Sequence, residues 1–106
     1  MIEKSVYDRV VAVAADYGRM QKKLSSGDVT REQAAGFTKA ICAVDHALEV
    51  VCEGERKEVR VALLTDIAER RGYERSVARA FYQTRRVFEK RKAQVIRLIA
   101  RLLDMI

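Results

Sequence analysis

The chain has 106 residues, of which 49% are hydrophobic and 34% charged, and it contains five glycines and no proline. This composition excludes an intrinsically disordered chain and favours a single helical domain, residues 1–106, with one modest core. The formal net charge is +6, and residues 60–101 hold twelve Lys and Arg against four Asp and Glu. A basic half of this kind favours a polyanionic partner, most often nucleic acid.

The pattern also argues against secretion, membrane insertion and catalysis. Cys42 and Cys52 lie about 15 Å apart at helical rise, too far for a mutual disulfide, so we expect a reduced, cytoplasmic chain. We expect no signal peptide, because charged residues interrupt the first twenty positions, and no apolar run reaches the ~18 residues of a membrane span. His46 is the only histidine, and a hydrolytic triad would also need a nucleophile and a positioned partner, so we expect no enzyme, no metal and no cofactor.

Residues 1–53 are predicted to form an antiparallel helical hairpin. In residues 2–24, apolar side chains recur at spacings of four and three, which predicts a first helix. These positions are Val6, Val10, Val13, Tyr17 and Met20. A break at residues 25–28 precedes Thr30 and Gln33, which fit a capping box at the start of a second helix. That helix has the same spacing at Phe37, Ile41, Val44, Leu48 and Val51.

Residues 54–106 are predicted to form a basic, helix-turn-helix-like half. The third helix covers residues 55–71, with Asp66 pairing with Arg70 one turn later. Its inward positions are Val59, Ala62, Leu63 and Ile67. A turn at Gly72 and Tyr73 leads into a long fourth helix, residues 75–105. Its first inward positions are Val77, Phe81, Thr84 and Phe88.

Basic and polar side chains lie beside that apolar face at the start of the fourth helix. A cationic helix behind a tight turn is how a helix-turn-helix presents itself to DNA. The predicted nucleic-acid-binding residues are Arg75, Ser76, Arg79, Tyr82, Gln83, Arg86, Lys90 and Lys92.

The segment from Ile67-Ala68 through Gly72-Tyr73 to Phe81 resembles the helix-turn-helix of sigma-factor region 4. It is most similar to phage late-gene transcriptional regulators of the RinA/ArpU type. The resemblance implies sequence-specific DNA binding and contact with RNA polymerase or a promoter. It also implies base contacts, which would come from Arg75, Ser76, Arg79 and Gln83.

The last residues, 95–106, carry a wide apolar arc on a helix that would be about 45 Å long. This segment is expected either to pack on the hairpin or to meet a second subunit in a homodimer. The predicted interface residues are Val95, Leu98, Ile99, Leu102 and Leu103.

Two main functions fit these patterns. The first is a small DNA-binding transcriptional regulator, encoded by a phage or mobile element, that reads duplex DNA with the start of the last helix. The alternative is a small helical inhibitor, such as an anti-CRISPR protein, whose basic helix enters the nucleic-acid channel of a CRISPR effector or grips its RNA. A third possibility is a helical oligomer whose basic charge is only solvated surface.

Overall fold

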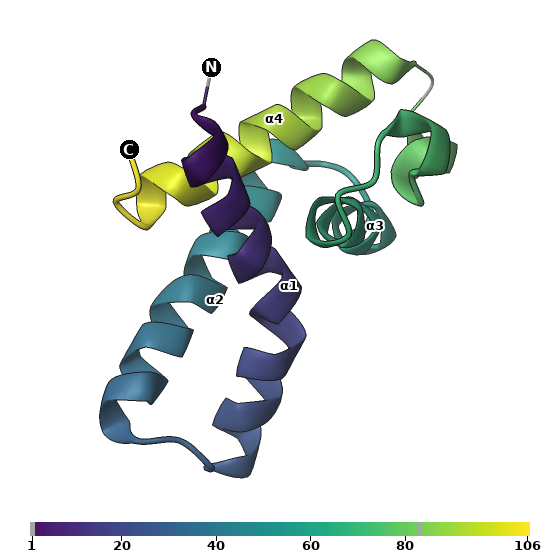
Figure 1. Ribbon diagram of the computed structural model, residues 1–106. Coiled ribbons are helices and arrows are strands. Elements are labelled where there is room, and N and C mark those ends of the chain that lie inside the picture. The colour runs from purple at the N-terminus through teal and green to yellow at the C-terminus, as the bar shows by residue number, and fades with distance from the viewer. Residues whose placement is uncertain (1, 83) are drawn as a thin grey trace.

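The computed structural model describes residues 2–82 and 84–106, which form four α-helices, two 3₁₀ turns and, within that part of the chain, no strand. The α-helices are α1 (Lys4–Ser26), α2 (Arg31–Val51), α3 (Lys57–Ala68) and α4 (Arg85–Leu102) (Figure 1). The 3₁₀ turns are η1 (Tyr73–Arg75) and η2 (Ala78–Phe81). The predicted all-α fold with four helices is therefore confirmed.

The connection between α1 and α2 follows from its sequence. Gly27 ends α1 with a φ of 72°, a left-handed conformation that a side chain would strain. Thr30 then caps α2, because its hydroxyl accepts from the N–H of Gln33 at 3.1 Å and the Gln33 side chain accepts from the N–H of Thr30 at 3.0 Å. The predicted break and capping box are both confirmed.

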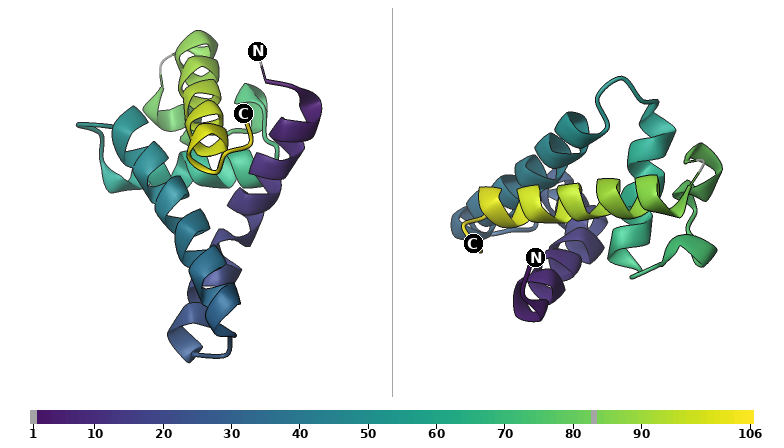
Figure 2. Two further views of the ribbon diagram at one scale, coloured as in Figure 1. Left: turned by 90° about the vertical axis from the view of Figure 1, so that its left-hand side faces the viewer. Right: turned by 90° about the horizontal axis from the view of Figure 1, so that it is seen from above.

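The two arms of the hairpin diverge away from this connection, and α4 lies across their open end (Figure 2, left). The core sits where the four helices meet. Its largest fully buried side chains include Val10, Val44, Leu63, Ile67, Phe88, Val95 and Ile99. The last helix therefore packs on the hairpin, which is the first of the two arrangements expected for it.

The predicted dimer interface on the last helix needs correction. Val95 and Ile99 have no exposed surface, because α4 packs on both helices of the hairpin. Leu98 and Leu103 are half-buried, and Leu102 is 37% exposed. Val95 and Ile99 therefore serve the core of one chain and are not available to a partner.

A hydrogen bond from the hydroxyl of Tyr17 to the carboxylate of Asp45 joins the arms of the hairpin. Burial, reinforced by that carboxylate, raises the pKa of Tyr17 from 10.0 to about 12. As the pH rises, the Tyr17 hydroxyl therefore loses its proton in the unfolded chain before it does so in the folded chain. The contribution of this hydroxyl to the free energy of unfolding is complete below pH 10 and is lost as the pH rises towards 12.

When the pH rises from about 9 to about 11, we therefore expect the free energy of unfolding to fall less in Tyr17→Phe than in the wild type. Urea unfolding at both pH values, followed by circular dichroism, measures the difference. Equal losses in the two proteins would contradict this role of Tyr17.

None of the helices that the structure describes combines the length and apolarity needed to cross a membrane.

Candidate nucleic-acid interface

The segment between α3 and α4 decides where the predicted binding residues lie. The chain leaves α3 at Arg70, whose φ of 54° is left-handed. The N–H of Arg71 donates to the carbonyl of Asp66 at 2.8 Å, and the N–H of Arg70 donates to that of Ile67 at 3.2 Å, which is a Schellman ending. The turn thus comes two residues before Gly72, whose φ of −79° any residue can adopt.

Asp66 holds this segment out of a helix. It is fully buried, and its carboxylate accepts from the hydroxyl of Ser76 at 2.5 Å and from the N–H groups of Val77 at 2.8 Å and Ala78 at 3.1 Å. Ser76 has an extended backbone with a ψ of 133°. These bonds satisfy donors that would otherwise be buried without a partner, and they fix an irregular path.

The last helix therefore begins at Arg85, ten residues later than predicted, and the expected continuous helix is wrong for residues 75–82 and for Thr84. Thr84 caps it, since its hydroxyl accepts from the N–H of Val87 at 3.2 Å. The predicted pair between Asp66 and Arg70 is also wrong. Arg70 instead pairs with Asp8 of α1 at 2.9 Å.

The predicted apolar face of residues 77–88 changes with this path. Phe88 is fully buried as expected, but Val77 is 42% exposed and Phe81 is 43% exposed. Both side chains were predicted to face the core, and both predictions are wrong. The periodicity that linked them to Phe88 does not correspond to a continuous helix.

Two of the four predicted base-contacting residues have side-chain partners within the chain. The hydroxyl of Ser76 is committed to Asp66. The guanidinium of Arg79 pairs with Glu74 at 3.6 Å and lies 5.1 Å from the ring centroid of Tyr73. Arg75 is exposed, at the end of η1 rather than at the start of a helix. These three side chains therefore do not form the outer face of one recognition helix.

Tyr82 and Lys92 also differ from the prediction that places them on an exposed basic side. Tyr82 is 6% exposed, and its hydroxyl donates to the carboxylate of Glu55 at 3.2 Å. Burial, followed by the neighbouring Cys52 and Glu55, raises the pKa of Tyr82. Lys92 is half-buried and donates to the carbonyl of Arg71 at 3.1 Å. Gln83 lies outside the described residues.

Two predicted residues, Arg86 and Lys90, are exposed on α4 and share a face with two arginines that were not predicted. We call this set the basic ridge, and its members are Arg86, Lys90, Arg97 and Arg101. Their spacings of four, seven and four place them within an arc of about 60° at about 100° per residue. Viewed from above, α4 lies uppermost along its whole length (Figure 2, right).

The basic ridge has little internal neutralisation. In the part of the chain that the structure describes, none of its four side chains takes part in an ion pair. Glu89 is the one acidic residue within α4. By contrast, the N-terminal flank of α4 is partly neutralised, because Glu74 pairs with Arg85 at 2.9 Å as well as with Arg79.

Sequence reasoning missed Arg97 and Arg101 because it interpreted residues 95–106 only by their apolar positions. The signal was present, since both continue the helical spacing of Arg86 and Lys90.

Comparisons of the chain with protein-family models, with curated proteins and with solved structures found no match.

Proposed function

We propose that the protein binds nucleic acid by placing the basic ridge of α4 against the phosphate backbone of duplex DNA. The observation that carries this proposal is the row of four exposed cations that have no ion-pair partner among residues 2–82 and 84–106. The row extends for about 22 Å along the helix. That length covers several phosphates, and a lone α-helix is narrow enough to enter the major groove of B-form DNA.

The charge distribution of the whole chain supports the same proposal. Residues 1–59 contain nine Lys and Arg against ten Asp and Glu. The excess positive charge therefore belongs to the half of the chain that contains α4. Phosphate contacts through such a surface supply affinity without sequence selection, because the backbone is the same at every base pair.

The prediction of a transcriptional regulator of the RinA/ArpU type requires base contacts in addition. Those contacts were assigned to Arg75, Ser76, Arg79 and Gln83. The side chains of Ser76 and Arg79 bind Asp66 and Glu74 inside the chain, Arg75 is exposed at the end of η1, and Gln83 lies outside the described residues. Phosphate binding is therefore the function better supported by the geometry. Regulation of transcription stays a prediction.

Two arginine variants separate phosphate contact from base contact. We expect Arg97→Ala to weaken binding by about fivefold on each of two duplexes of unrelated sequence at about 0.1 M salt. We expect Arg79→Ala to stay within about twofold of the wild type on both, because that guanidinium is already paired. Fluorescence anisotropy gives both affinities, and Arg31→Ala on α2 is the control for lost charge.

Each other outcome has a definite meaning. A loss on one duplex only for Arg79→Ala would contradict the proposal and support base contact by that residue. Absence of binding to either duplex by the wild type would also contradict it. The inhibitor of a nucleoprotein complex would then be the better explanation of the basic ridge.

A further inference from the structure

One apolar residue of α3 faces solvent, although the other apolar side chains of this helix serve the core. Val59, Leu63 and Ile67 are buried, and the half-buried Leu64 and Ala68 pack against the core. Val61 is instead 56% exposed. A helix at the surface of a monomer normally presents polar residues to water, so Val61 is the exception on the outer side of α3.

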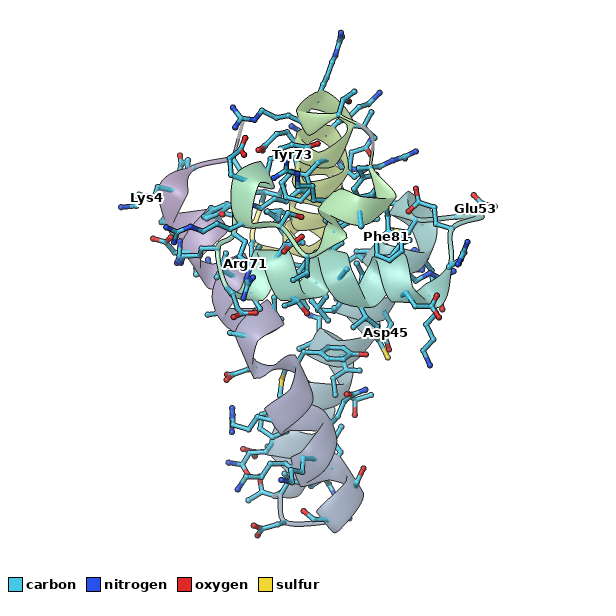
Figure 3. The ribbon with its side chains drawn as sticks, turned by 90° about the vertical axis from the view of Figure 1, so that its right-hand side faces the viewer. Lys4, Asp45, Glu53, Arg71, Tyr73 and Phe81 are labelled. Carbon is cyan, nitrogen blue, oxygen red and sulfur yellow. The ribbon has the colours of Figure 1, made fainter. Side chains whose placement is uncertain are left out.

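The segment before α4 enlarges this apolar surface. Val77 borders the same shallow groove as Val61, together with Ala62 and Thr65 of α3. Phe81 lies over α3 in the view onto this side (Figure 3). We call Val61, Val77 and Phe81 the α3 patch. Their exposed fractions are 56%, 42% and 43%.

The side chains of the α3 patch lie outside the core of the chain. Val77 and Phe81 were expected in the core, but the hydrogen bonds of Asp66 hold this segment along a path that leaves both side chains in water. Val61 and Val77 share one groove, and exposed apolar side chains that gather in this way mark an interaction site.

The rim of the patch carries one charge of each sign. Lys57 and Glu58, at the start of α3, line the same groove, and both are exposed. Among residues 2–82 and 84–106, neither takes part in an ion pair. A two-fold axis that runs through the apolar centre and between Lys57 and Glu58 places each of these charges opposite the other charge of a second copy, so the patch can pair with a copy of itself.

We propose that the α3 patch binds a second copy of this chain in a two-fold symmetric dimer. Val61, Val77 and Phe81 form its centre, and Lys57 of one protomer faces Glu58 of the other in two equivalent pairs. The net charge of +6 opposes self-association through the basic surfaces of the chain. At the α3 patch the opposite rim charges reduce that repulsion.

Such a dimer is compatible with nucleic-acid binding and does not require it. The basic ridge belongs to α4 and the patch to α3 and the segment of η2, so pairing through the patch keeps two ridges available. Two linked ridges would bind a long duplex more tightly than one through effective concentration. Failure of the dimer and failure of nucleic-acid binding are separate results, because the mass of the protein is measured without nucleic acid.

Sedimentation equilibrium of the full chain tests the dimer. The wild type should rise from the monomer mass of 12.1 kDa towards twice that value between about 5 and 200 µM. Val61→Glu should stay monomeric over that range. Val50→Glu is the matched control, since Val50 is 50% exposed on α2, and it should dimerise as the wild type does. Leu102→Glu should also dimerise.

Exchange of the rim charges tests the pairing itself. Lys57→Glu and Glu58→Lys should each weaken the dimer by about tenfold, because two opposite-charge contacts become like-charge contacts. The double variant Lys57→Glu/Glu58→Lys should restore it to within about threefold of the wild type. Circular dichroism confirms that each variant is folded.

Three results would overturn the proposal. The first is a wild type that remains at 12.1 kDa over the whole range. The second is a Val61→Glu variant that dimerises as well as Val50→Glu. The third is a double charge exchange that associates no better than the single variants.

Discussion

Asp66→Asn is expected to lower the free energy of unfolding by about 3 kcal/mol. The buried carboxylate accepts from three donors, the hydroxyl of Ser76 and the N–H groups of Val77 and Ala78. An asparagine amide has the same shape but presents an NH₂ group where acceptors are needed. In either orientation the NH₂ group faces the N–H of Val77 or of Ala78, and that N–H loses its bond to the residue, although Ala78 also donates to the hydroxyl of Ser76 at 3.0 Å. The charge that strengthens the remaining bonds is removed as well.

Urea unfolding followed by circular dichroism measures this loss. Asp16→Asn is the matched control, because Asp16 is an exposed carboxylate on α1 that pairs with Arg19 at 3.2 Å, and its removal should cost under about 0.5 kcal/mol. Equal unfolding midpoints for the two variants would show that Asp66 does not hold the segment.

The sequence predicts the helices well where local signals agree. Spacings of three and four, the capping pair of Thr30 and Gln33 and the glycine at the end of α1 all give the hairpin correctly. The inward side of α3 is also correct, since Val59, Leu63 and Ile67 are buried. Each of these features depends on residues within a few positions of one another, which is the range that a sequence pattern reports.

The start of the last helix depends instead on contacts across ten to twelve residues. Val77 and Phe81 match a helical period, but the carboxylate of Asp66 binds residues 76–78 and overrides that pattern. A sequence gives no sign that an aspartate on a helix will be buried. Because the last helix begins after Tyr82, this residue lies in the core rather than in the predicted interface, and Glu55 accepts its hydrogen bond.

The late start of α4 also made part of the predicted interface wrong. Arg86 and Lys90 are on the outer side of α4, as the proposed site requires. Arg97 and Arg101 were missed because the apolar neighbours Val95, Ile99 and Leu102 suggested a subunit contact. In the structure, Val95 and Ile99 face inwards while Arg97 and Arg101 remain exposed.

Removal of the basic ridge should cause the largest loss of nucleic-acid affinity. The variant that replaces Arg86, Lys90, Arg97 and Arg101 by alanine should bind duplex DNA at least about a hundredfold more weakly at about 0.1 M salt, since each phosphate contact releases bound counterions. The four side chains are exposed, and alanine favours a helix. The variant should therefore remain folded, which circular dichroism checks.

A second quadruple variant separates the ridge from net charge. It replaces four exposed cations of the hairpin by alanine and removes the same number of positive charges. These cations are Lys4, Arg9, Lys22 and Arg31. The control should lose less than about fivefold in affinity, because only long-range attraction is weakened.

The slope of the logarithm of the binding constant against the logarithm of salt concentration tests the ridge most directly. It should be measured on one duplex for the wild type and both quadruple variants. We predict that the slope loses about three to four units in the ridge variant and less than about one unit in the hairpin variant. Equal slopes for the two variants would contradict phosphate binding by α4.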